Sequence, residues 1–308
     1  MIYLLLLFSI YNFQILSIMN TLHIIGNGFD IYHGIDSRYW DFYQFLEQNR
    51  YSSFISQMEN FFTDTTPDGD ILLWSDFEMA LGNIDFNSTF DYCTEDYEID
   101  YDHMMRSTAQ IEDAPGFFLG GILQEMHEKF EEWVKSININ VYRKTLEHFD
   151  SKGRFFTFNY TDTLETVYKI PSENILHIHG SRTKNEPLIV GHCNYIDPHS
   201  IGDEDMLMHE ENALRSIAEL ANQEMKSVEE IIAHHNSYWK SLSEVDEVNV
   251  YGHSLSNVDL PYFRKIKENI KPCAQWNFSF HDDKDVKNIK QMIATLGLSI
   301  NSCTSFRM

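Results

Sequence analysis

Short apolar runs that end in glycine or polar residues constrain the fold of this chain more than any other feature of its sequence. The first run, residues 22–25, reads Leu-His-Ile-Ile and ends in Gly26-Asn27-Gly28. A strand followed by a tight glycine turn opens nucleotide-binding α/β domains. The sequence therefore predicts a Rossmann-like core that begins at about residue 22.

Further β-prone runs return after a long helical stretch. They occupy residues 154–158, 175–178, 188–190, 248–251 and 276–280, and a helix is predicted over 284–296. Strands separated by helices indicate a mostly parallel sheet with helices on both faces. Apolar residues at helical spacing predict a large, mainly helical insertion at 37–149 and a smaller helical segment at 204–241. We expect a single α/β domain over 19–308.

Residues 1–18 are apolar, which raises the question of a signal or an anchor. The stretch has no Lys or Arg, Asn12 and Gln14 interrupt it, and no small-residue cleavage site follows. Met19 lies just before the first strand. We expect a mis-assigned start upstream of Met19, with an apolar, membrane-associated leader as the alternative.

The cysteines and the charge limit the class of protein. Cys93, Cys193, Cys273 and Cys303 form no Cys-x-x-Cys pair, so we expect no local zinc knuckle and a reducing, cytoplasmic location. The chain has 47 Asp and Glu against 23 Lys and Arg, a formal net charge of -24. Such a field repels phosphate backbones, so nucleic acid is not an expected partner. A membrane is not an expected partner either, because residues 1–18 fit a membrane span poorly.

The Gly26-x-Gly28 turn is the first candidate binding element. Glycine lets a backbone turn tightly and bring its N–H groups close to a phosphate. The third glycine of the usual dinucleotide fingerprint is absent, because Phe29-Asp30 follows Gly28 instead. An ordinary tight turn is the alternative.

Asn159 follows the predicted strand 154–158, at the edge of the sheet where ligands bind. Its carboxamide can orient a water molecule or a ribose hydroxyl, because it has both a donor and an acceptor. Alternatively, Asn159 caps the helix that begins near Asp162.

His177 and His179 end the next predicted strand, and strand alternation places both on one face. His179 is nearer the carboxyl end of the strand and has the better position for a general base, whereas His177 is expected to be buried and hydrogen bonded. Two such histidines resemble a metal pair, but no carboxylate or cysteine completes a site, so no metal is predicted.

A fourth loop follows the predicted strand 248–251. Gly252 and Ser254 could admit and hydrogen bond a ribose or a phosphate, although a plain strand-to-helix loop fits as well. Four loops that meet at one edge of a sheet favour a site more than any one of them does.

Together these stretches resemble the AbiH proteins of bacteriophage abortive infection. The matching segments are Ile24–Asp30 with His33-Gly34, Tyr39 and Asp41-Phe42; Trp74–Glu78; Phe158–Thr161 with Leu164-Glu165; His177–Gly180; and Tyr251–Leu255 with Asp259. They extend over about 22–263, nearly the whole chain. The resemblance implies a role in antiphage defence.

A wider resemblance is to the sirtuin-like fold, whose members bind NAD. Gly26-Asn27-Gly28, Thr157-Phe158-Asn159-Tyr160, His179-Gly180-Ser181 and Gly252-His253-Ser254-Leu255 are similar to its four site loops, in the same order. The resemblance implies that His179 and Asn159 are catalytic. It implies a set of NAD-binding residues, namely Gly26, Asn27, Gly28, Phe29, Asp30, Tyr160, Gly180, Gly252, His253 and Ser254. The chain departs from the sirtuin pattern at Phe29-Asp30 and at His253.

Sirtuin deacylases also contain a zinc module with two Cys-x-x-Cys pairs, which this chain lacks. The resemblance therefore implies NAD hydrolysis rather than protein deacylation. The alternative is a non-catalytic nucleotide sensor or interaction module in phage defence. An NAD hydrolase must be silent in the uninfected cell, so we expect a phage-derived trigger, and restraint by the 37–149 insertion or by homo-oligomerisation.

Overall fold

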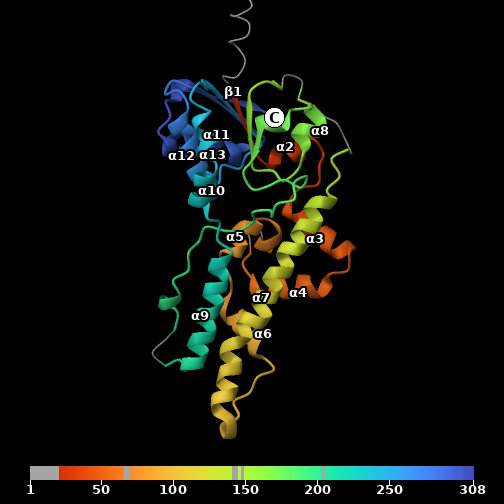
Figure 1. Ribbon diagram of the computed structural model, residues 1–308, viewed down its shortest axis with the longest axis vertical. Helices are drawn as coiled ribbons and strands as arrows, with labels where there is room; N and C mark the ends of the chain where they lie inside the picture. Colours follow the sequence, from red (N-terminus) through yellow and green to blue (C-terminus); the bar gives the residue numbers. More distant parts are fainter. Residues whose placement is uncertain (1–20, 66–68, 70, 141–144, 147–148, 203–204) are drawn as a thin grey trace, which may run out of the picture. The chain divides into compact units, whose positions relative to one another are not determined.

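The computed structural model describes residues 21–65, 69, 71–140, 145–146, 149–202 and 205–308 (Figure 1). The predictions for residues 1–18 lie outside the described residues. The chain forms two compact units. Unit 1 comprises Met1–Asp36, Ile137–Leu188 and Ser227–Met308, and unit 2 comprises Ser37–Ser136 and Ile189–Lys226.

Unit 1 is built on a six-stranded sheet in which all neighbouring strands are parallel. The strands are β1 (Thr21–Ile25), β2 (Arg154–Thr157), β3 (Ile175–His177), β4 (Glu247–Tyr251), β5 (Gln275–Phe280) and β6 (Cys303–Arg307), in the order β3-β2-β1-β4-β5-β6. The α/β, Rossmann-like prediction is confirmed. Because the direction of winding reverses between β1 and β4, the carboxyl ends of these two strands mark the edge at which such sheets bind ligands.

Strand alternation divides the apolar side chains of the sheet between two faces. Leu22 and Ile24 belong to a core with Tyr262, Phe263 and Met292. The helices on this face are α10 (Val228–His234), α11 (Asn236–Lys240), α12 (Leu260–Asn269) and α13 (Asp283–Leu296).

The opposite face has a smaller core around Ile25, Phe155 and Tyr251. Phe29 of α2 (Asn27–Tyr32) and Leu164 of α8 (Thr163–Tyr168) cover it. The prediction of helices on both faces is confirmed, and Figure 1 shows α2 and α8 apart from the group of α10 to α13.

Two strand predictions differ from the structure. Residues 188–190 form no strand, because the chain passes there from unit 1 to unit 2 and its backbone has no neighbouring strand. Strand β6 was not predicted. It pairs with β5 from Trp276 opposite Cys303 to Phe280 opposite Arg307, and as an edge strand it has no fully buried residue that would give it an apolar pattern.

Unit 2 is helical and has an aromatic core. Its helices are α3 (Tyr39–Gln48), α4 (Ser52–Phe61), α5 (Phe77–Leu81), α6 (Phe86–Thr94), α7 (Met104–Ser136) and α9 (Met208–Gln223). Phe42 lies 5.3 Å from Trp133 and 5.5 Å from Phe130, ring centre to ring centre, and Phe77 stacks on Phe130 at 6.1 Å. Phe42, Phe77 and Phe130 are buried almost completely, so aromatic contacts hold these helices together.

Helices α7 and α9 run side by side in the same direction. A β-carbon at Gly120 would lie 3.7 Å from the side chain of Leu220, and His127 Nε2 lies 2.7 Å from Glu224 Oε2 farther along both helices. The predicted segment 204–241 is thus shared between the units, since α9 belongs to unit 2 while α10 and α11 belong to unit 1. Among the described residues, no helix has the length and apolar character needed to cross a membrane.

Candidate functional site

The loops after β1 and β4 touch backbone to backbone. The Gly26 N–H donates to the carbonyl of Tyr251 at 2.9 Å, and the Gly28 N–H donates to the carbonyl of Gly252 at 2.7 Å. A β-carbon on Gly26 would lie 2.6 Å from the α-carbon of His253, and one on Gly28 would lie 2.8 Å from the α-carbon of Gly252. Glycine is therefore required here because no side chain fits between the loops. The expected contact of this turn with a phosphate stays a prediction.

Asp30 joins the β1 loop to the loop after β2. Its side chain is fully buried, and it accepts hydrogen bonds from Thr161 Oγ1 at 2.5 Å and Thr163 Oγ1 at 2.8 Å. Burial raises the pKa of Asp30, and the hydrogen bonds from Thr161, Thr163 and Asn159 oppose that rise.

The residues before Asp30 differ in exposure. Phe29 is fully buried in the apolar core, whereas Asn27, the first residue of α2, is exposed. Of these three predicted NAD-binding residues, only Asn27 lies at the surface.

Asn159 lies in the loop after β2 with its carboxamide directed at the β1 loop. Its Nδ2 donates to the carbonyl of Gly26 at 3.2 Å, and its backbone N–H donates to Thr157 Oγ1 at 3.0 Å. Because the carbonyl can only accept, the amide nitrogen must face it, which fixes the position of Oδ1. The helix α8 begins after Asp162, so Asn159 is not its cap.

The Oδ1 atom of Asn159 is a buried acceptor. Asn159 is 7% exposed, and among the described residues Oδ1 has no hydrogen-bond partner. A buried acceptor without a protein donor is a position for a water molecule or a donor group of a ligand. The site can therefore orient a hydroxyl group beside the Gly26 loop.

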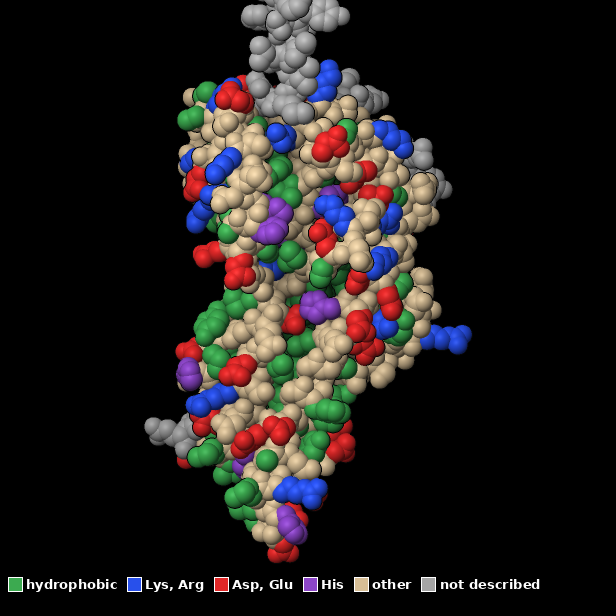
Figure 2. Space-filling model, viewed as in Figure 1, with side chains coloured by type: hydrophobic (Ala, Val, Ile, Leu, Met, Phe, Trp, Pro, Cys, Tyr) green, Lys and Arg blue, Asp and Glu red, His purple; other side chains and the backbone are tan. Residues whose placement is uncertain are grey.

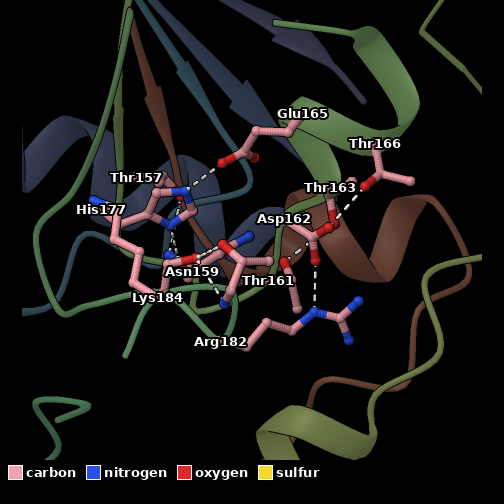
Figure 3. A network of polar contacts seen from close by, with 12 residues as sticks. Thr157, Asn159, Thr161, Asp162, Thr163, Glu165, Thr166, His177, Arg182 and Lys184 are labelled. Carbon is pink, nitrogen blue, oxygen red and sulfur yellow. Dashed lines mark hydrogen bonds and ion pairs between the residues drawn. The ribbon is translucent and has the colours of Figure 1, made fainter. Parts of the chain in front are cut away.

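His177 is buried between two acceptors (Figure 3). Its Nδ1 lies 3.0 Å from the backbone carbonyl of Asn159, and its Nε2 lies 3.1 Å from Glu165 Oε1. Because a backbone carbonyl can only accept, Nδ1 donates to Asn159, and Nε2 lies against the Glu165 carboxylate. The burial and hydrogen bonding expected for His177 are confirmed. Glu165 was missed as a site residue, although two features pointed to it: the family-matching pair Leu164-Glu165 and its position in the first turn of α8.

His179 has a different environment from His177. Strand β3 ends at His177, so strand alternation does not extend to His179, which lies in the following turn. His179 is 4% exposed, and its ring centre lies 5.6 Å from that of Phe158, 5.8 Å from that of Tyr262 and 6.4 Å from that of Tyr160. An aromatic cluster therefore encloses the predicted general base.

The loop after β4 is held by its own histidine. His253 Nδ1 accepts the backbone N–H of Leu255 at 2.8 Å, so the ring proton is on Nε2, which lies 3.3 Å from Asp259 Oδ2. Leu255 has a φ of 57°, a left-handed conformation that is rare for leucine. His253 thus shapes the loop, while Ser254 is exposed. The ring of His253 also lies 4.4 Å from that of Phe158.

Arg182 and Asp162 connect the loops after β2 and β3. Arg182 Nε donates to Asp162 Oδ1 at 2.5 Å, and Thr166 Oγ1 donates to Asp162 Oδ2 at 2.7 Å (Figure 3). Burial disfavours the charge of Asp162, but the hydrogen bonds from Thr166 and Arg182 hold its pKa below the usual value. The backbone N–H of Arg182 donates to the carbonyl of Tyr160 at 2.9 Å. The sequence reasoning missed this ion pair because its partners are 20 residues apart.

The structure brings most of the predicted residues into one connected group in unit 1. The glycine turns meet each other, Asn159 meets Gly26, and Phe158 separates His179 from His253. Gly180, with a φ of 88°, ends the turn that contains His179. Within the described ranges, no group of three or more His, Cys, Asp or Glu side chains is arranged to hold a metal ion.

Comparison with known proteins identifies the family. Residues 22–280 match the family model described as bacteriophage abortive infection AbiH. No curated protein and no solved structure matches the chain. Because the family match extends over most of the chain and includes every loop of the site, this protein belongs to the AbiH family of bacteriophage abortive infection proteins.

Proposed function

We propose that this protein acts in abortive infection by hydrolysing NAD at the carboxyl edge of the unit 1 sheet, where the β1 and β4 loops meet. The family supplies the biological role. The strand order supports a nucleotide at this edge, because the winding reverses between β1 and β4. The choice of NAD depends on the resemblance of four loops to the sirtuin-like fold.

The buried Oδ1 atom of Asn159 is the observation that carries the proposal. It lies on a carboxamide whose Nδ2 is fixed by Gly26, in the loop that faces the reversal of the strand order. An acceptor held in this way can orient a water molecule or a ribose hydroxyl without moving during the reaction.

The proposed reaction breaks the bond between the nicotinamide nitrogen and ribose C1′. The oxygen of a water molecule bonds to C1′ while nicotinamide leaves with the electron pair of the broken bond. The nicotinamide ring, which is cationic in NAD, leaves neutral. His179 takes the proton of the water molecule, and the products are ADP-ribose and nicotinamide.

The described conformation fits a resting enzyme. His179 is enclosed by Phe158, Tyr160 and Tyr262, so this cluster has to open before the base can reach a water molecule. An effector that consumes the cytoplasmic NAD of its own cell must stay inactive before infection. We infer that a phage-derived trigger opens the cluster, and that homo-oligomerisation or unit 2 restrains it.

The test is the NAD concentration over time with purified full-length protein in lysate of phage-infected cells, which supplies the inferred trigger, beside His179→Ala and Asn159→Ala. We expect loss of NAD with release of nicotinamide, reduced at least 100-fold in both variants. His281→Ala is the matched control, because His281 is an exposed histidine of the same unit. Equal turnover in His179→Ala and the unchanged protein would refute the proposed base.

A second candidate is a sensor that binds a nucleotide without turnover. The enclosure of His179 favours it, since a ring that never leaves its aromatic cluster cannot act as a base. Saturable NAD binding by calorimetry without nicotinamide release, in lysate of infected cells as well as in buffer, would establish the sensor in place of the hydrolase.

A further inference from the structure

Exposed apolar side chains gather in unit 2 where α7 and α9 begin. Tyr101, just before α7, is 84% exposed, Met105 in its first turn is 87% exposed, and Met208, the first residue of α9, is 76% exposed. Met104 and Leu207, at 55% and 56%, complete a group that we name the apolar tip. An exposed apolar cluster on an otherwise charged unit marks an interaction surface.

The packing of the two helices brings the members of the apolar tip to one end. Gly120 of α7 lies opposite Leu220 of α9, and both helices run in the same direction. Counting back equally from this contact places Met208 beside the first turns of α7. Residues from two separate parts of the chain therefore form one surface.

The apolar tip is surrounded by acidic residues. Residues 95–106 contain five Asp or Glu and one Arg, and residues 205–211 contain three Asp or Glu and neither Lys nor Arg. The whole of unit 2 has 29 acidic residues and seven Lys or Arg. Figure 2, in the orientation of Figure 1, shows hydrophobic and acidic side chains interspersed over the ends of α7 and α9.

We propose that the apolar tip binds an amphipathic helix of a partner protein whose polar face is rich in Lys and Arg. Methionine side chains are flexible and polarisable, so they adapt to the apolar face of a helix. The acidic surroundings attract the basic face and accelerate the encounter. A phage-derived or host protein with such a helix is the kind of partner that fits.

The acidic charge around the apolar tip favours this partner over the other molecules that could cover an apolar surface. A second copy would bring another acidic tip against the first, and an anionic membrane would repel the tip in the same way. Nucleic acid is repelled for the same reason. The inference does not depend on NAD hydrolysis, because the apolar tip and the sheet edge belong to different units.

The test measures binding of a fluorescent 14-residue peptide with leucines on one helical face and lysines on the other. Full-length protein is titrated into the peptide, and anisotropy gives the Kd. The double variant Met105→Ser with Met208→Ser should bind about tenfold more weakly, because two apolar contacts are lost. Phe117→Ser is the matched control, since Phe117 is 75% exposed on α7 outside the apolar tip. It should change the Kd by less than about twofold.

The charge requirement is tested with the same peptide carrying Glu in place of Lys. It should not bind, and binding of the Lys peptide should weaken as salt rises. Absence of saturable binding by the Lys peptide, equal binding by the Glu peptide, or an unchanged Kd in the double variant would each overturn the proposal. Self-association or binding to anionic vesicles that the double variant abolishes would also overturn it, by assigning the tip to another occupant.

Discussion

The two units differ most in charge. Unit 2 has 29 acidic residues against seven Lys or Arg, a net charge of -22, whereas unit 1 has 18 against 16, a net charge of -2. Almost all of the charge that argues against a polyanionic ligand thus belongs to unit 2. The proposed nucleotide edge belongs to a nearly neutral unit, where an anionic ligand is not repelled by the scaffold.

The units also differ in what they bury. Unit 2 buries an aromatic core, and its buried ion pair joins Lys226 to Glu78 at 2.5 Å. Unit 1 buries a group of polar side chains at one edge of its sheet, including Asp30, Asn159 and His177. Buried polar groups are costly unless they are paired, so their concentration at a ligand edge is typical of a functional site. Chemistry is therefore expected in unit 1 and recognition in unit 2.

The largest expected effect concerns the ion pair of unit 2. Lys226 has a fully buried side chain, so Glu78→Gln would leave a buried charge without its carboxylate. We expect the free energy of unfolding of unit 2 to fall by about 3–5 kcal/mol. Urea unfolding followed by circular dichroism measures it. Glu131→Gln is the control, because its partner Lys135 is half exposed. A change below about 1 kcal/mol for Glu78→Gln would show that water reaches the pair.

The next effect concerns the contact of the glycine loops in unit 1. Gly252 has a φ of 58°, and a β-carbon there would lie 2.2 Å from the backbone nitrogen of Phe29. Gly252→Ala should cost about 3–4 kcal/mol, from left-handed backbone and overpacking together. Thermal unfolding measures the loss. If Gly252→Ala keeps the stability of the unchanged protein, the two loops do not touch in solution.

A third prediction concerns the pH dependence of the stability of unit 1. Burial lowers the pKa of His23, in the core of unit 1, to about 4, so folded protein binds fewer protons than unfolded protein between about pH 4 and 6.5. The stabilisation is fully present above pH 6.5 and is lost as the pH falls to about 4, by about 3 kcal/mol. His23→Phe should remove this part of the pH dependence of unfolding. The same slope in both proteins would assign the acid loss to other groups.

The smallest effect has the opposite sign. Gly116 lies inside α7 of unit 2, and a β-carbon there would meet nothing within 4 Å. Gly116→Ala should therefore stabilise unit 2 by about 0.5–1 kcal/mol, because alanine favours the helix. A rise in the thermal midpoint measures it. Destabilisation instead would mean that a partner or a bend of the helix needs this position.

Much of the fold could be predicted because each interior strand of the sheet appears in the sequence as a short apolar run. The runs at 22–25 and 248–251 lie within β1 and β4, which are buried on both faces. Strand β6 escaped prediction because an edge strand has little apolar signal. The run at 188–190 misled because three apolar residues do not reveal whether a neighbouring strand exists.

The candidate site also has features that the sequence predicted and features that it could not predict. The sequence placed Asn159 and the glycine turns at strand ends, where the structure has them. It could not place Glu165 against His177 or Asp30 against Thr161, because these pairs form only when separate loops meet. It predicted different roles for His177 and His179, but it could not show that His179 lies in a turn beyond the strand, since that depends on where β3 ends.

Periodicity, turn chemistry and composition are local properties, so the sequence alone predicts the parallel α/β core, the positions of the loops along it and the total charge. Which unit carries the charge depends on the tertiary structure, because Ile189–Lys226 joins Ser37–Ser136 across a long stretch of chain. The tertiary structure also explains why the first loop needs glycine, since the β4 loop packs directly against it. The physical reason is that close approach between distant segments depends on packing, and no property of either segment alone specifies it.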